Sequence, residues 1–458
     1  MFYMSHYSKS FHSLCRLGGP LVLGHFAHMS IGLTDSVMLG WYSVEALAAA
    51  ILGHTVFFVI FIVGAGFARA IMPLVASAIA QGDCVQARRV TRMGLWLSAA
   101  FTFAVFPTFW WSETLLAAIG QSPELSMLSS RYLVIVGFAI FPALALDVIK
   151  SYLSAQELMR FVLCITLAGF LINIPLNYVL IFGKISFPEL GVQGSAIASL
   201  SVNIVMAVGV CIYAVKKLPE QALFVRIWRP DWSAMHKVLQ LGIPIGVTSL
   251  AEAGLFSAST IMMGWLGTVP LAAHGIALHI TSLTFVIHVG LSEAATIQAG
   301  QAFGAANFHS LKKNALSAAL ASLIIVLLTV ILFLSVPEVL VSLFVDPLSP
   351  YFQDILRYGA LLLLMAALFS TVDAAQVMTL GILRGMHDTS IPMAMAIFSY
   401  WCVGIPIAYW FCFVLQWEGV GLWAGLALGL ACAAGGLIAR LFWVYGKLRK
   451  TVRMATSV

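Results

Sequence analysis

The sequence predicts an all-α polytopic membrane protein, and its composition and its apolar runs support this fold class. Hydrophobic residues make up 61% of the chain and charged residues only 9%, whereas a soluble domain carries about 25% charged residues. Long apolar runs recur along the whole chain, and about 20 apolar residues suffice to cross a bilayer as a helix. These runs lack the alternating period of a lipid-facing strand, which excludes a transmembrane β-barrel.

Twelve apolar runs are the expected transmembrane helices. Several exceed the minimum length, which indicates tilt or helices that project beyond the bilayer. The segment before the first run, Met1–Ser13, is polar and shows no cleavable signal. In order along the chain, the expected spans are 14–41, 46–80, 93–112, 131–155, 161–183, 192–215, 238–266, 270–304, 314–335, 355–384, 390–415 and 419–446.

Basic residues fall mainly on one side of the predicted bundle. If the spans alternate in direction, twenty of the 24 Lys and Arg residues lie on the side of Met1. The opposite side holds three, Arg131, Lys184 and Arg357, and Arg69 lies within a span. Since cytoplasmic loops are enriched in Lys and Arg, both termini are predicted to be cytoplasmic. The net charge of +6 is explained by this orientation in a bacterial-type inner cell membrane, and no nucleic-acid partner is expected.

The second half of the chain repeats the first. A shift of 224 residues aligns Leu17–Pro20 with Leu241–Pro244, and Met38–Trp41 with Met262–Trp265. An even number of spans per repeat gives both halves the same orientation, related by a pseudo-twofold axis along the membrane normal. The expected organisation is an N-terminal six-helix lobe (1–215), a cytoplasmic interlobe linker (216–237) and a C-terminal six-helix lobe (238–458).

Polar side chains within the first half suggest a buried site. A carboxylate within a span costs roughly 2.5–3.5 kcal/mol on insertion scales, so it marks a functional site by default. Asp35 shares one helical face of the first span with His28, whose repeat equivalent is Glu252. Asn173 and Asn177 lie one turn apart on the fifth span. The alternative is a structural role, in which the carboxylates are fixed in hydrogen-bond networks and the amides satisfy a carbonyl freed by proline.

The second half presents two mid-span carboxylates, Glu252 and Asp373, with Gln376 on the same face as Asp373. Clustered carboxylates in a low-dielectric site favour the uptake of a proton near neutral pH. The same oxygens are also able to hold Na⁺, and the sequence leaves the ion open. No cofactor and no structural metal are expected, so Na⁺ at Glu252 and Asp373 would be a coupling ion.

Two further charged residues, Arg69 on the second span and Glu293 on the eighth, occupy equivalent positions in the two repeats. Equivalent positions approach each other when they lie near a twofold axis. We hypothesise an ion pair that closes the cytoplasmic side in the outward-open state and breaks in the inward-open state. The alternative is local pairing of each residue within its own lobe.

The order of several short segments resembles the multidrug and toxic compound extrusion (MATE) family over nearly the whole chain. The resemblance implies a cation-coupled antiporter that expels organic, often cationic and aromatic, compounds. The segments that carry it are Thr34–Gly40, Ala46–Ala49, Gly64–Gly66, Pro73–Ala76, Ala251–Gly254, Phe256–Ser257, Met262–Gly264 and Leu380–Gly385.

Three acidic residues match the NorM-like branch of that family: Asp35, Glu252 and Asp373. In that branch the latter two belong to a cation site. Some relatives form a first-lobe proton network with an Asn and an Asp on the fifth span. Here Asn173 matches the Asn, but the second position is Asn177 and not Asp, which moves the expected ion coupling to the second lobe.

The expected function is antiport by alternating access between the two lobes, driven by H⁺ or Na⁺, because the chain has no Walker motif. Glu252 and Asp373 are expected to bind the coupling ion. Phe256 and Phe369 are expected to stack on planar cations. The expected partners are the lipid bilayer and small organic cations, and the protein is expected to function as a monomer. The residues expected to bind substrate or protons are Asp35, His28, Asn173, Asn177, Gln376 and Phe256.

Two other functions fit the sequence less well. A lipid-linked oligosaccharide or polysaccharide flippase of the same superfamily needs a large cationic cavity, whereas this chain sets one buried arginine, Arg69, against five carboxylates within spans. An intramembrane enzyme would need a His-Glu-x-x-His pattern or a pair of catalytic aspartates with a glycine-flanked motif. Neither pattern is present, so no enzymatic activity is expected.

Overall fold

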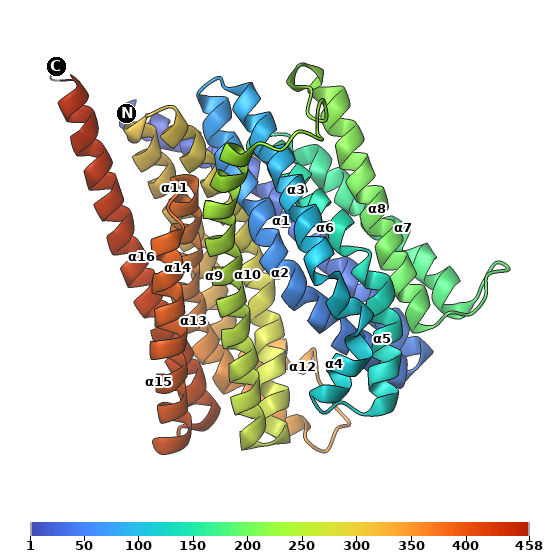
Figure 1. Cartoon of the computed structure of the whole chain (residues 1–458). Helices are drawn as coiled ribbons and strands as arrows, with labels where there is room; N and C mark the ends of the chain where they lie inside the picture. Colours follow the sequence, from blue (N-terminus) through green and yellow to red (C-terminus); the bar gives the residue numbers. More distant parts are fainter. Residues whose placement is uncertain (1, 457–458) are drawn as a thin grey trace. The chain divides into compact units, whose positions relative to one another are not determined.

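The computed structural model describes residues 2–456, and side chains are described for residues 10–449. Within this range every regular element is a helix (Figure 1). The α-helices are α1 (Phe2–Tyr42), α2 (Val44–Ala80), α3 (Cys84–Trp110), α4 (Ser112–Ala118), α5 (Pro123–Gly137), α6 (Ile140–Ala155), α7 (Met159–Phe182), α8 (Val192–Lys217), α9 (Trp232–Leu266), α10 (Thr268–Gly304), α11 (Phe308–Ser335), α12 (Pro337–Ser342), α13 (Phe352–Gly385), α14 (Ser390–Ile397), α15 (Ile405–Tyr409) and α16 (Glu418–Thr456). A short 3₁₀ helix, η1 (Pro219–Gln221), and two π-helical segments, η2 (Phe398–Gly404) and η3 (Trp410–Val414), complete the set.

The helices agree with the predicted spans, of which up to eleven meet the length and hydropathy of a membrane crossing. Ten are long and apolar enough to cross a membrane, and the pair α5 and α6, bent by 45°, forms one more span. The remaining span is α1, which is 41 residues long and whose hydropathy is lowered by His25, His28 and Asp35. The eleventh span differs from the prediction of one regular helix, because η2 and η3 interrupt it on both sides of α15.

The chain forms two compact units, which are described separately. The N-terminal unit comprises residues 23–246, and the C-terminal unit comprises residues 1–22 and 247–458. The predicted lobes have other limits, because the border between the units falls inside α1 and α9, at positions one repeat length apart. Within the N-terminal unit, a Cβ added to Gly66 of α2 would lie 2.4 Å from the carbonyl oxygen of Gly242 in α9. Small residues therefore hold the first part of α9 against α2.

In the N-terminal unit, α2 packs against α3, α5 and α6, and α7 packs against α8. The fully buried phenyl ring of Phe109 and the buried Tyr132 lie in its core cluster, with small residues of α2 such as Ala49. Met38 and Leu39 of α1, close in sequence to Asp35, belong to the same cluster.

The segment 216–237, predicted as a cytoplasmic linker, lies along α3 of the N-terminal unit. Arg89 forms an ion pair with Asp231, and Arg92 donates to the carbonyl oxygen of Leu223 at 2.6 Å. The indole N–H of Trp96 donates to the carbonyl of Ile227 at 2.7 Å. These contacts make the linker a part of the N-terminal unit.

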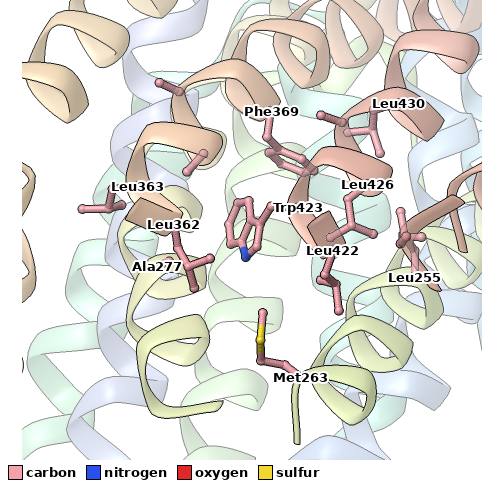
Figure 2. Packing of buried hydrophobic residues seen from close by; sticks show 14 of the residues in the cluster. Leu255, Met263, Ala277, Leu362, Leu363, Phe369, Leu422, Trp423, Leu426 and Leu430 are labelled. Carbon is pink, nitrogen blue, oxygen red and sulfur yellow. The ribbon is translucent and has the colours of Figure 1, made fainter. Parts of the chain in front are cut away.

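In the C-terminal unit, α13 packs against α10, α11, α12 and α16. Figure 2 shows the core of this unit, in which the fully buried indole of Trp423 lies beside Phe369 and among leucines of α13 and α16. Glycine lets the last span approach the eleventh closely: a Cβ added to Gly425 would lie 2.2 Å from Cα of Ala408 in α15. The eleventh span therefore packs directly on the α16 backbone.

Candidate functional site

Asp35 is the centre of a hydrogen-bond network in the N-terminal unit. Its Oδ1 accepts from the side-chain amides of Asn173 at 3.0 Å and Asn177 at 2.6 Å, and its Oδ2 accepts from the hydroxyl of Ser199 at 2.7 Å. The carboxylate on α1 is thus held by two residues of α7 and one of α8. Both asparagines are fully buried.

The side-chain amides of Asn173 and Asn177 on α7 donate hydrogen bonds to Asp35. The structural alternative, in which they only satisfy a carbonyl freed by Pro175, does not account for these bonds. Helix α7 continues through Pro175, and one N–H of each flanking asparagine side chain is directed to Asp35. Neutral donors stabilise the carboxylate as an anion without neutralising its charge.

Two residues around Asp35 were not indicated by the sequence. Ser199 is a single polar residue in an apolar span, and its equivalent in the second repeat is the apolar Trp423. Neither the local sequence pattern nor the comparison of the two repeats therefore indicated a site at this position. Tyr132 of α5 is buried close enough to Asp35 for the charge of the carboxylate to act on its phenol. Both are brought to α1 by the packing of the unit.

His28 shares α1 with Asp35 but lies in a different environment. The charges of Lys150 and Asp147 on α6, together with His54 on α2, act on the imidazole. None of the hydrogen bonds that the structure records for Asp35 among the described residues involves His28. The two residues of the first span thus have different neighbours: α6 and α2 around His28, and α7 and α8 around Asp35.

The C-terminal unit brings the two predicted mid-span carboxylates together. The charges of Glu252 on α9 and Asp373 on α13 interact with each other. Asp373 is 3% exposed and Gln376, less than one turn further on, is fully buried. The Gln376 amide donates a hydrogen bond to the hydroxyl of Tyr400 in η2.

The chemistry of this second site suits a small hard cation or a proton. Carboxylate and amide oxygens are the ligands that hard cations prefer. Within the described residues, Asp373 Oδ1 and Gln376 Oε1 are buried and have no hydrogen-bond partner. No cluster of three or more His, Cys, Asp or Glu side chains suited to a metal ion occurs in the described part of the chain, so the site rests on two carboxylates and neutral oxygens.

The aromatic residues of this unit differ in accessibility. The rings of Phe256 and Phe369 meet edge to face, with centroids 6.0 Å apart. Phe369 is 1% exposed and also contacts Trp423, so the expectation that it stacks on a planar cation is wrong: packing covers its faces. Phe256 is only partly buried and retains that role as a prediction.

Arg69 lies on α2 of the N-terminal unit, and Glu293 lies on α10 of the C-terminal unit. The ion pair between them stays a prediction. Both are partly buried, which agrees with their expected positions within spans.

A model of the family described as MatE matches residues 20–179 and 244–410. The chain is 40% identical over 444 residues to the probable multidrug resistance protein NorM of Rhizobium meliloti, covering 96% of this chain and 94% of that protein. It is 39% identical over 439 residues to the protein of the same name from Agrobacterium fabrum, covering 95% and 94%.

Solved structures share the fold. A structure described as MATE in the bent conformation superposes with a TM-score of 0.88 at 21% identity and covers 96% of each chain. The eukaryotic MATE transporter AtDTX14 gives a TM-score of 0.84 at 19% identity and covers 98% of this chain and 99% of its own. At these identities the likeness establishes the fold.

Proposed function

Because this chain belongs to the MatE family of multidrug efflux transporters, we propose that it exports organic cations, planar aromatic ones among them, in exchange for H⁺ or Na⁺. As a family member it is a transporter in the lipid bilayer and not an enzyme, and it needs no cofactor. Its curated relatives carry the name of multidrug resistance proteins, which supports a broad range of organic substrates.

The observation that carries the proposal is the carboxylate pair of the C-terminal unit. Asp373 is buried, and the charge of Glu252 acts on it. Two interacting carboxylates in a low-dielectric site are unfavourable as a pair of anions, so uptake of a proton or Na⁺ stabilises them. We assign ion coupling to these two residues.

The remaining polar residues are assigned to substrate or protons. Asp35, held by Asn173 and Asn177, attracts a cation because its hydrogen bonds leave its charge intact. His28 and Gln376 extend the polar surfaces, and Phe256 offers a partly exposed ring for stacking. In this scheme ion binding and substrate binding compete, which gives exchange.

We propose that the two six-span halves alternate access by rocking, with Arg69 and Glu293 as a cytoplasmic gate. The excess of basic residues on the side of Met1 supports cytoplasmic termini and an inner-membrane location. Each positive charge driven inward across ~100 mV supplies about 2.3 kcal/mol, so one or two ions support severalfold to hundredfold concentrative export. We propose that a monomer suffices, since each chain carries both repeats.

The family match favours an exporter over a flippase of lipid-linked saccharides. Arg69 is the basic residue placed deep within a span, whereas polyanionic headgroups would require a cationic cavity. The carboxylates Asp35, Glu252 and Asp373 give the opposite charge.

The test is drug efflux from proteoliposomes under a pH gradient and, separately, under a Na⁺ gradient. Glu252→Gln and Asp373→Asn are each expected to abolish efflux driven by the coupling ion. The amide that replaces each carboxylate has a similar shape but no negative charge with which to bind H⁺ or Na⁺. The matched control is Asp354→Asn, an exposed carboxylate on the same helix α13. Cells that express the double variant and still resist drugs like the wild type would contradict the assignment.

A further inference from the structure

The eleventh span departs from α-helical geometry at two places. The π-helical segments η2 (Phe398–Gly404) and η3 (Trp410–Val414) flank the short helix α15. π-Helical turns are rare and occur frequently at functional sites. Both segments pack on α16, where Gly404 and Gly429 bring the two backbones close together. The distorted segments are therefore packed against a neighbouring helix of the same unit.

η2 presents two consecutive aromatic residues to the neighbouring helices. Tyr400 is fully buried and accepts a hydrogen bond from Gln376 of α13. Trp401 donates its indole N–H to the carbonyl of Ala251 on α9 at 3.2 Å. A Cβ added to Gly254 would lie 2.8 Å from Cζ2 of Trp401, so the indole fits closely against α9. The segment is thus tied to both helices that carry the carboxylate pair.

The hydroxyl of Tyr400 lies within the electrostatic reach of that pair. The charges of Glu252 and Asp373 both act on the phenol, and so does the opposite charge of Arg384 on α13. Because the phenol oxygen accepts from Gln376, its own O–H remains available to donate to a nearby carboxylate. The oxygen also has lone-pair density for a cation.

Two buried acceptors beside Tyr400 point to a ligand. In the described part of the chain, Oδ1 of Asp373 and Oε1 of Gln376 lack a hydrogen-bond partner although both side chains are more than nine-tenths buried. Buried acceptors of native proteins are nearly always satisfied by a donor, a water or an ion. A donor set of carboxylate, amide and phenol oxygens has the chemistry of a site for a small hard cation.

We propose that Tyr400 is a third ligand group of the coupling-cation site and that η2 holds its hydroxyl against Glu252 and Asp373. The proposal deepens the proposed function and rests on it, because the two carboxylates must bind the coupling ion. In this proposal Tyr400 is an uncharged ligand of the site, and the two carboxylates supply the negative charge. The phenol oxygen strengthens cation binding and so lowers the cation concentration needed for turnover.

The test uses the full chain in proteoliposomes, with drug efflux measured against Na⁺ concentration and against pH. Tyr400→Phe removes one oxygen and keeps the ring. It is expected to raise the half-saturating Na⁺ concentration about tenfold, the effect of losing one hydrogen-bond-strength contact to a charge, with little change in the maximal rate. If H⁺ is the coupling ion, the pH of half-maximal efflux is expected to rise by about one unit, because a donor to the carboxylates is lost.

The matched control is Tyr409→Phe in the same span. Tyr409 is 49% exposed and lines an apolar pocket with Trp265 and Met262, so its hydroxyl is expected to leave both ion dependences unchanged. Trp401→Phe tests the positioning by η2, since it removes the bond to Ala251 but no ligand atom. It is expected to shift the ion dependence in the same direction as Tyr400→Phe.

If a variant transports too slowly for its ion dependence to be determined, ion binding is measured instead by thermal unfolding. Na⁺ is expected to raise the thermal unfolding midpoint of the wild type, as a ligand of the folded state does, and to raise that of Tyr400→Phe less at equal concentration. Wild-type ion dependence of Tyr400→Phe in both assays would overturn the role of Tyr400. Retention of coupling by Asp373→Asn would instead overturn the proposed function, so the two failures are distinguishable.

Discussion

At the residue scale, Asp35 illustrates how a carboxylate within a span is held without a counter-ion. Three neutral donors, from Asn173, Asn177 and Ser199, satisfy its oxygens. Each hydrogen bond to a charged group contributes about 1.5–3 kcal/mol, which together offset much of the cost of placing the charge there.

The exchange Asn177→Asp is expected to make efflux more dependent on a pH gradient. The Asn177 amide lies 2.6 Å from Oδ1 of Asp35, so the variant places two carboxylates in hydrogen-bond contact, and such a pair shares a proton. The measurement is the ratio of drug efflux under a pH gradient to efflux under a Na⁺ gradient. Asn177→Leu, which removes the donor and adds no charge, is the control. An unchanged ratio in Asn177→Asp would contradict the idea that Asp35 takes part in proton movement.

The site was predicted in part from the sequence, and the missed residues have a common physical cause. Asp35, Glu252 and Asp373 were indicated because a charge is costly in an apolar run. Ser199 and Tyr400 are residue types that apolar spans tolerate, so their presence carries little information. Their roles depend on which helix lies beside them, and a periodic pattern does not contain that information.

At the element scale, the linker is held against α3 by specific contacts, among them the ion pair between Arg89 and Asp231. Although burial raises the pKa of Asp231, hydrogen bonds from Arg89, the Ala234 N–H and the Ser233 hydroxyl, together with the Arg89 charge, lower it to about 2. A carboxyl group whose pKa is lowered by folding stabilises the folded form at neutral pH. That contribution is lost as the pH falls from the ordinary value of 3.8 toward about 2.

Asp231→Asn is therefore expected to loosen the linker at neutral pH. The measurement is amide hydrogen exchange of residues 218–231, which is expected to be faster in the variant than in the wild type. In the wild type, protection is expected to decline below about pH 4, whereas the variant should lack this step. Identical exchange in both proteins at neutral pH would show that the Arg89–Asp231 pair does not hold the linker.

The eleventh span shows where an element departs from its local pattern. The sequence predicted one continuous span over 390–415, and its outer limits agree with α14 to η3. Within it, the π-helical segments and α15 pack on α16, where Gly425 lies against Ala408. An apolar run has the same amino-acid composition whether its turns are α-helical or π-helical. The distortion was therefore not predictable from the residues of the span.

At the scale of the whole molecule, the two repeats have diverged in chemistry while keeping their arrangement. Position 35 carries a carboxylate, but its repeat equivalent is Ser259, whose hydroxyl lies 3.5 Å from Nε2 of His274. The equivalent of Ser199 is Trp423, whose indole donates to Nδ1 of the same histidine at 3.1 Å. The N-terminal unit thus has its acidic group at this position, and the C-terminal unit has its acidic pair on α9 and α13.

The proposed gate is testable by charge reversal. Arg69→Glu and Glu293→Arg are each expected to lower the drug efflux rate in proteoliposomes strongly, because each single reversal places two like charges at the gate. The double reversal is expected to restore most of the rate, since the pair is regenerated with opposite polarity. A double variant as impaired as the worse single variant would indicate local pairing of each residue within its own unit.

The sequence by itself determined the twelve spans, the repeat of 224 residues and the acidic positions Asp35, Glu252 and Asp373. These features are properties of the local chain: apolar length, identity after a shift, and a charge where water is excluded. Tertiary structure decided the border of the units inside α1 and α9, the docking of the linker on α3, and the hydrogen bonds from Ser199 to Asp35 and from Gln376 to Tyr400. Those features arise from helices that are distant along the chain and adjacent in space, where packing and not composition selects the partner of each polar group.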